Sequence, residues 1–187
     1  STDGICRLLQ LRRVAFVASE KPEMSVSAKT NQVEADMIAA MVERIFRQAD
    51  RFDYSATVGV IVPYRNQIAT VRNAIDRYGI PALHSITIDT VERFQGSQRD
   101  YIIYGLTVQQ RCQLNFLTDN VFEEDGTLID RKLNVAMTRA RKHLTIVGNP
   151  DILAGSAVYR RLMDFMKSRG CYFNVACEKF CAGDFSV

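Results

Sequence analysis

Short apolar runs rich in β-branched residues alternate with amphipathic segments along most of this chain. The apolar runs cover residues 12–19, 57–62, 85–91, 100–108 and 143–148. Most of them are continuous rather than alternating, which is typical of strands buried on both faces of a parallel sheet. The pattern predicts one α/β domain, in which a mainly parallel sheet lies between two layers of helices.

Four segments place apolar residues at helical spacing and are predicted to be helices: 32–49, 66–78, 130–140 and 156–169. The first is the clearest, because Asn31 and Glu34 have the layout of a capping box with Asn in place of Ser or Thr. The first dozen residues are weakly patterned, and the polar stretch 109–126 is expected to be a functional or mobile loop. The expected domain spans residues 1–187, with a core at about 13–169 and an unassigned tail at 170–187.

Composition narrows the class of protein. Apolar residues make up 47% of the chain, which excludes disorder as a general description. No apolar run approaches the ~20 residues of a membrane span, and there is no secretory signal pattern. We therefore expect no membrane partner and an intracellular, cytoplasmic location, with the nucleoid or nucleus as alternatives. No CxxC pair occurs, so reduced thiols without a metal are expected for the five cysteines: Cys6, Cys112, Cys171, Cys177 and Cys181.

Several common catalytic motifs are absent from the sequence. It contains no GxxxxGK[ST] phosphate loop, no GxGxxG and no HExxH. The two histidines, His84 and His143, lie in different segments, and His143 opens an apolar run. We therefore expect His143 to be a packed or edge residue rather than half of a Cys–His nucleophilic pair.

Two segments remain as candidates for function. Residues 90–100, TVERFQGSQRD, connect two predicted strands, and Gly96 allows a close backbone approach to a ligand. Functional loops of α/β sheets lie at the carboxyl ends of strands, so we expect the site in the segments after Val62, Val91 and Gly148 and at the ends of the helices near them. The second candidate is a basic group without an intervening acid: Arg131, Lys132, Arg139, Arg141 and Lys142. Alone, it is better explained as a solvated basic surface; the alternative is a set of arginines that faces phosphate.

Together, these segments carry a resemblance. TVERFQGSQRD and LNVAMTRARKHLTIVGNP are similar to motifs V and VI of superfamily 1B helicases, the group that contains the nonsense-mediated-decay RNA helicase. Residues 60–67, VIVPYRNQ, resemble the strand-PYxxQ segment of that group, and residues 31–45 resemble the helix before it. The similarity runs from about residue 13 to residue 150 in the same order.

The resemblance implies the second of two RecA-like domains, a P-loop-NTPase-type three-layer sandwich that lacks its own phosphate loop. ATP and Mg²⁺ would bind in the cleft between the two domains, with the phosphate loop and the magnesium-binding acids on the first. The family's QYR segment is missing, so the chain is expected to begin just inside the second domain. The implied partners are single-stranded DNA or RNA and the first RecA-like domain of the same protein.

The resemblance also implies roles for individual residues. Arg139 matches the arginine finger, and Gly96 matches the glycine whose backbone lies near the nucleotide. Gln98 stands where the family usually has a glutamate that contacts the nucleotide, so an acceptor is kept and a charge is lost. Nucleic-acid contacts fall on Thr90, Tyr64 and Gln67. Bracing or coupling roles fall on Gln95, Glu92 (in place of the usual aspartate), Asn134, Thr138 and Arg141.

The leading hypothesis is thus the C-terminal motor half of an ATP-dependent helicase that moves 5′ to 3′ and is inactive as an isolated fragment. The alternative is a non-catalytic RecA-like module that binds nucleic acid or a protein. The departure at Gln98 favours the module, whereas an intact Arg139 favours the motor.

Overall fold

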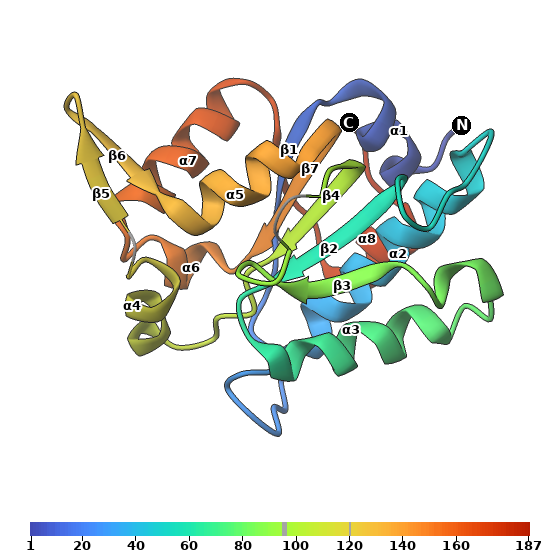
Figure 1. The fold of residues 1–187 in the computed structure, drawn as a ribbon, viewed down its shortest axis with the longest axis horizontal. Helices are drawn as coiled ribbons and strands as arrows, with labels where there is room; N and C mark the ends of the chain where they lie inside the picture. Colours follow the sequence, from blue (N-terminus) through green and yellow to red (C-terminus); the bar gives the residue numbers. More distant parts are fainter. Residues whose placement is uncertain (95–96, 120) are drawn as a thin grey trace.

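A six-stranded sheet forms the centre of this computed structural model, which describes residues 1–94, 97–119 and 121–187 (Figure 1). The strands lie in the order β3-β2-β4-β7-β1-β8 and all of their pairings are parallel. The predicted α/β fold with a mainly parallel sheet is therefore confirmed. The strands are β1 Val14–Ala18, β2 Val58–Val62, β3 Thr87–Thr90, β4 Arg99–Gly105, β7 Ala140–Gly148 and β8 Tyr172–Asn174.

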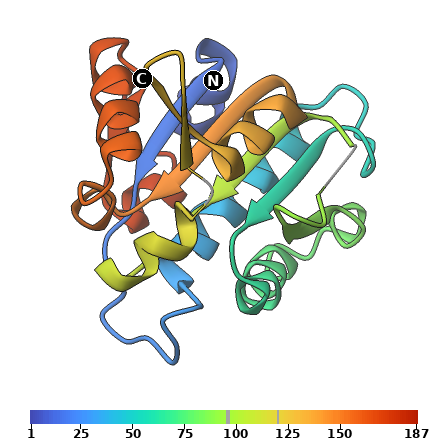
Figure 2. The same cartoon turned by 60° about the vertical axis from the view of Figure 1, so that its left-hand side comes forward.

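Helices cover both faces of the sheet, as the continuous apolar strands predict (Figure 2). On one face, Val17 and Val147 pack with α1 Gly4–Leu11, α2 Gln32–Gln48, α3 Arg65–Asp76 and α8 Cys177–Cys181. On the other face, Phe16 and Ile146 pack with α5 Arg131–Arg139, α6 Pro150–Leu153 and α7 Ala157–Ser168. Neighbouring residues of one strand thus enter two separate cores, which explains why the strands are apolar throughout.

Both ends of the chain add to this core. Helix α1 is capped by Asp3, whose side chain accepts a hydrogen bond of 2.9 Å from the backbone N–H of Cys6. Ile5 and Phe180 are fully buried, and β8 extends the sheet by pairing with β1. Residues 1–12 therefore contain the helix α1, and residues 170–187 contain β8 and α8, although the sequence pattern of both segments was too weak to predict them.

The expectation of a loop over residues 109–126 is wrong in part. This stretch contains the 3₁₀ helix η2 Arg111–Gln113, the short helix α4 Leu114–Leu117 and the strand β5 Val121–Glu124. Strand β5 forms an antiparallel hairpin with β6 Thr127–Asp130. Its turn is Asp125-Gly126, where both residues have positive φ angles of 50° and 76°. Asp-Gly is a strong hairpin signal, so the turn could have been read from the sequence.

Candidate functional site

The predicted site begins with residues 91–98, which connect β3 to β4. Because β2 lies between these two strands in the sheet, the connection is called the crossing segment here. Phe94, in the middle of this segment, is fully buried and packs against Gly59 of β2. A Cβ atom at Gly59 would lie 2.5 Å from Phe94 Cζ, so the missing side chain provides the space for the ring. Gln95 and Gly96, two predicted site residues, lie outside the described residues.

Helix α5 brings Arg139 to this crossing segment. Asp130 caps the helix by accepting hydrogen bonds from the backbone N–H groups of Lys132 and Leu133. Arg139 is the last residue of the helix and is half-buried, and its Nε donates a hydrogen bond of 3.3 Å to the Phe94 carbonyl oxygen. The finger candidate is thus fixed to the crossing segment by the inner nitrogen of its guanidinium.

Two further contacts join the predicted motifs. Gln98 donates a hydrogen bond from Nε2 to the Thr138 carbonyl oxygen at 3.3 Å. Arg141 donates from Nε to Asp100 Oδ1 at 3.0 Å and from a terminal nitrogen to the Ala56 carbonyl oxygen at 2.9 Å. These contacts are possible because β4 and β7 are parallel neighbours, which places the start of each strand beside the other.

The expectation that the whole site lies at the carboxyl ends of the strands is wrong for Arg139. It lies at the amino end of β7, which begins at Ala140. The crossing segment is the reason, because it leaves β3 after Thr90 at the carboxyl edge and must reach the amino end of β4 at Arg99. The connection between β3 and β4 therefore runs from the carboxyl ends of the strands to their amino ends.

At the carboxyl edge there is a surface pocket of about 620 Å³. Three of the predicted residues line it: Tyr64, Thr90 and Glu92. The Tyr64 ring stacks on the ring of Phe116 from α4, with centroids 4.9 Å apart and planes 21° from parallel. Phe116 was not predicted, because nothing local in an apparent loop indicates that it meets Tyr64.

Lys132 holds Phe116 in place. Its Nζ donates to the Phe116 carbonyl oxygen at 2.8 Å, lies 2.6 Å from Asp119 Oδ1 and is 4.7 Å from the centre of the Phe116 ring. Lys132 itself is buried. The basic group is therefore not one solvated surface, since Lys132 binds α4 whereas Arg141 and Lys142 both face Asp100.

Gln67 is not brought to the pocket. It is fully buried, and its side chain exchanges two hydrogen bonds of 2.8 Å with the backbone N–H and carbonyl of Asn31. These bonds join α3 to the start of α2 and leave the side chain no surface for a nucleic acid. The expected direct contact therefore conflicts with its burial. Two other predicted residues, Asn134 and Thr138, are exposed on α5.

A buried carboxyl group supports the loop that leads to Phe116. Glu34 of α2 accepts hydrogen bonds from the Ser19 hydroxyl at 2.8 Å and from the backbone N–H of Thr107 at 2.9 Å. Thr107 has a φ angle of 68°, which is unusual for a β-branched residue and needs support from its surroundings. Burial raises the pKa of Glu34 to about 7, although these hydrogen bonds lower it.

His143 is a packed residue, as predicted. It is buried in β7, and its two ring nitrogens lie 2.6 Å from the Arg12 carbonyl oxygen and 2.5 Å from the Thr145 hydroxyl. Within the described ranges, no three His, Cys, Asp or Glu side chains are placed to hold a metal ion. None of the helices in that part of the chain has the length and apolar character needed to cross a bilayer.

Comparisons with known proteins show which family and which relatives the sequence of this chain resembles. Residues 7–151 match the family described as an AAA domain. The chain is 32% identical to helicase sen1 of Schizosaccharomyces pombe over 84% of its length, and 32% identical to a regulator of nonsense transcripts 1 homolog of Drosophila melanogaster, also over 84%. It is 31% identical over 64% of its length to the putative helicase mov-10-B.2 of Danio rerio.

The chain spans only 9%, 13% and 12% of these relatives, respectively. The region matched by the family, residues 7–151, nevertheless includes all elements from β1 to β7, and with them both segments that form the site. The sheet order and the parallel pairing agree with a RecA-like fold. The chain therefore belongs to the superfamily 1B helicases, as a RecA-like AAA domain of the group that includes Sen1 and the regulators of nonsense transcripts.

Proposed function

We propose that this chain is the C-terminal motor domain of an ATP-dependent nucleic-acid helicase, with Arg139 as its arginine finger. The hydrogen bond from Arg139 Nε to the Phe94 carbonyl carries the proposal. It fixes the inner nitrogen, and the two terminal nitrogens are the part of a guanidinium that binds phosphate as a fork. A positioned arginine of this kind stabilises the charge that develops on the γ-phosphate in the transition state.

ATP and Mg²⁺ belong to this proposal together with the first RecA-like domain. On this chain, the hydrogen-bond donor that suits a phosphate is the Arg139 guanidinium. Gln98 lies close to it, because its side chain donates a hydrogen bond to the carbonyl oxygen of the preceding residue, Thr138. Bound ATP would supply the reactive γ-phosphate. The phosphate loop and the magnesium-binding acids would come from the first domain, as the family resemblance implies.

The pocket at the carboxyl edge is the proposed contact with single-stranded DNA or RNA. The Tyr64–Phe116 stack offers an aromatic surface, and successive bases stack on such surfaces regardless of sequence. Lys29 and Arg65 are exposed and line the same pocket, where positive charge favours the phosphate backbone. The relatives named above as helicases support a nucleic-acid partner.

The crossing segment would couple the two activities. Thr90 stands at the pocket at one end of it, while Phe94 and Gln98 contact the region of Arg139 further along. ATP would close the domains because it contacts both, and hydrolysis would remove the contact between the γ-phosphate and Arg139. Each cycle would then move the pocket along the strand in the implied 5′ to 3′ direction.

Replacement of the finger tests the proposal in the intact protein. Arg139→Ala should lower ATP turnover by ~10³–10⁵-fold and leave ATP binding largely unchanged. Arg51→Ala is the matched control, because Arg51 is also an arginine but is exposed in the loop before β2. Turnover of Arg139→Ala at the wild-type rate would contradict the assignment. The isolated 187-residue chain should show no ATPase activity stimulated by single strands, since half of the site would be missing.

A further inference from the structure

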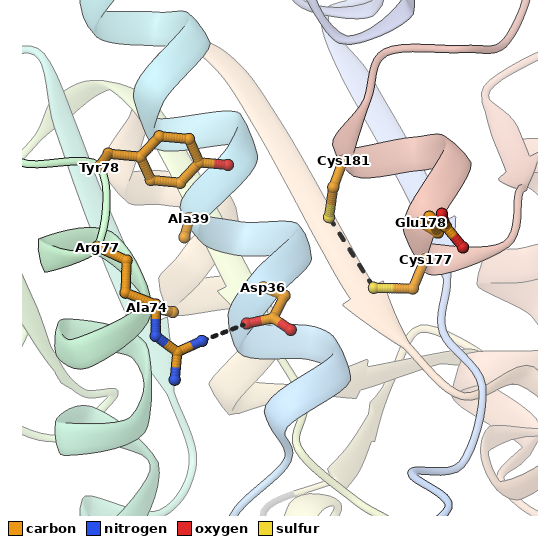
Figure 3. Close-up of a pocket in the computed structure, with 8 residues that line it drawn as sticks. All are labelled: Asp36, Ala39, Ala74, Arg77, Tyr78, Cys177, Glu178 and Cys181. Atoms are coloured by element: carbon orange, nitrogen blue, oxygen red, sulfur yellow. Dashed lines mark hydrogen bonds and ion pairs between the residues drawn. The ribbon is translucent and has the colours of Figure 1, made fainter.

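A second pocket, of about 600 Å³, lies on the face of the sheet opposite to Arg139, between α2, α3 and α8 (Figure 3). Cys177 and Cys181 of α8 form one wall, and Tyr78 lies on the opposite side. Asp36 of α2 lies between them and pairs with Arg77 across 3.7 Å. The proposed motor function uses none of these side chains.

The two thiols are in contact. Their Sγ atoms are 3.9 Å apart, because positions four residues apart share one side of a helix. Both residues are half-buried and line the pocket, so small reagents can reach them, unlike the buried Cys6. The end of α8 that carries Cys181 is anchored, since Phe180 is buried in the core and Arg44 donates a hydrogen bond of 2.7 Å to the Cys181 carbonyl oxygen.

We propose that Cys177 and Cys181 form a dithiol site that hydroperoxides oxidise to an intramolecular disulfide. Residues four apart in a helix have Cα atoms about 6 Å from each other, which is within the range that a disulfide spans. The sulfurs must approach to about 2.05 Å. Helix α8 has five residues and no side-chain cap, so a local change in its backbone allows this approach.

The reaction balances with one hydroperoxide. The Cys177 thiolate attacks the terminal peroxide oxygen, the O–O bond breaks, and a sulfenic acid forms together with an alkoxide, or with hydroxide when the oxidant is hydrogen peroxide. The Cys181 sulfur then attacks the Cys177 sulfur, the S–S bond forms, the S–O bond breaks, and the oxygen leaves as water with the Cys181 proton. With hydrogen peroxide, two thiols are oxidised by two electrons and two waters are produced. The hydrogen bond from Cys181 lowers the pKa of Cys177, which favours Cys177 as the attacking thiol.

Peptide mapping of the protein that contains this chain tests the proposal. Trypsin cleaves after Arg169 and after Lys179, so it separates peptide 170–179 from the peptide that begins at Phe180. After treatment with hydrogen peroxide, the two peptides should appear as one linked species, lighter than their sum by two hydrogens. Dithiothreitol should separate them again.

Single substitutions identify the partners, because peptide 170–179 also contains Cys171. Cys177→Ser and Cys181→Ser should both abolish the linked species, and in Cys181→Ser a cyclic diketone probe should label Cys177 as a sulfenic acid. Cys171→Ser is the matched control and should keep the linkage. Persistence of the link in Cys177→Ser would overturn the proposal. Oxidation of the exposed Cys112 alone, with both peptides unlinked, would overturn it as well.

Discussion

Gln98 donates a side-chain hydrogen bond of 3.3 Å to the carbonyl oxygen of Thr138, the residue before Arg139. An ionised glutamate, the residue usual in the family at this position, has no proton to donate to a carbonyl. The amide thus gives position 98 a structural role that a carboxylate does not fill. It connects the end of the crossing segment to the end of α5.

Loss of this hydrogen bond should affect turnover moderately. A neutral hydrogen bond contributes about 0.5–1.5 kcal/mol, so Gln98→Ala should lower ATP turnover of the intact protein by about 2- to 12-fold. Gln98→Glu should lower it similarly, because the donor is lost there too. Gln32→Ala, a substitution of an exposed glutamine on α2, is the control. A Gln98→Glu protein that is faster than wild type would show that nucleotide contact outweighs the link to Thr138.

Truncation of Phe116 should weaken binding of single strands. Stacking of one base on an aromatic side chain contributes about 1–3 kcal/mol, so Phe116→Ala should raise the Kd for a labelled single strand by about 5- to 150-fold. Phe165→Ala is the matched control, because Phe165 is also exposed but lies on α7. Fluorescence anisotropy of the intact protein measures both, and equal Kd values for the two variants would exclude the stacking role.

The sequence predicted the parts of the fold that depend on local pattern and failed where distant residues meet. The apolar runs predicted the mainly parallel sheet, but the pairing of β4 with β7, which places the two candidate segments side by side, is seen only in the structure. The burial of Gln67 and the stack of Phe116 on Tyr64 depend on contacts between distant segments, which leave no local periodicity. Arg139 lies at the unexpected edge because α5 ends at Arg139 and β7 begins at Ala140, and a general rule for α/β sheets does not anticipate a site at the amino end of a strand.

A methyl group at Gly59 should disturb the site through Phe94. The added Cβ would lie 2.5 Å from Phe94 Cζ, and overpacking of a core costs about 1–3 kcal/mol. Gly59→Ala should therefore lower the free energy of unfolding in urea by that amount and also reduce ATP turnover, because the Phe94 carbonyl holds Arg139.

A double variant at positions 59 and 94 tests whether the clash between the new Cβ and the Phe94 ring causes the loss of stability. Phe94→Leu alone should also destabilise the protein, because it leaves a void beside Gly59. If the clash is the cause, Gly59→Ala combined with Phe94→Leu should be less destabilised than the sum of the two single effects. Strict additivity would show that the cost at Gly59 comes from elsewhere.

Glu34 should make stability depend on pH. Its pKa is raised from 4.5 to about 7 in the folded chain, so between these values the folded protein holds a proton that the unfolded chain has released. The contribution of Glu34 to the free energy of unfolding should be fully present below pH 4.5 and should fall by about 3 kcal/mol as the pH rises to 7. Glu34→Gln should flatten the profile of unfolding free energy over that window, whereas Glu20→Gln, at an exposed position, should not. An unchanged fall in Glu34→Gln would assign the dependence to another group.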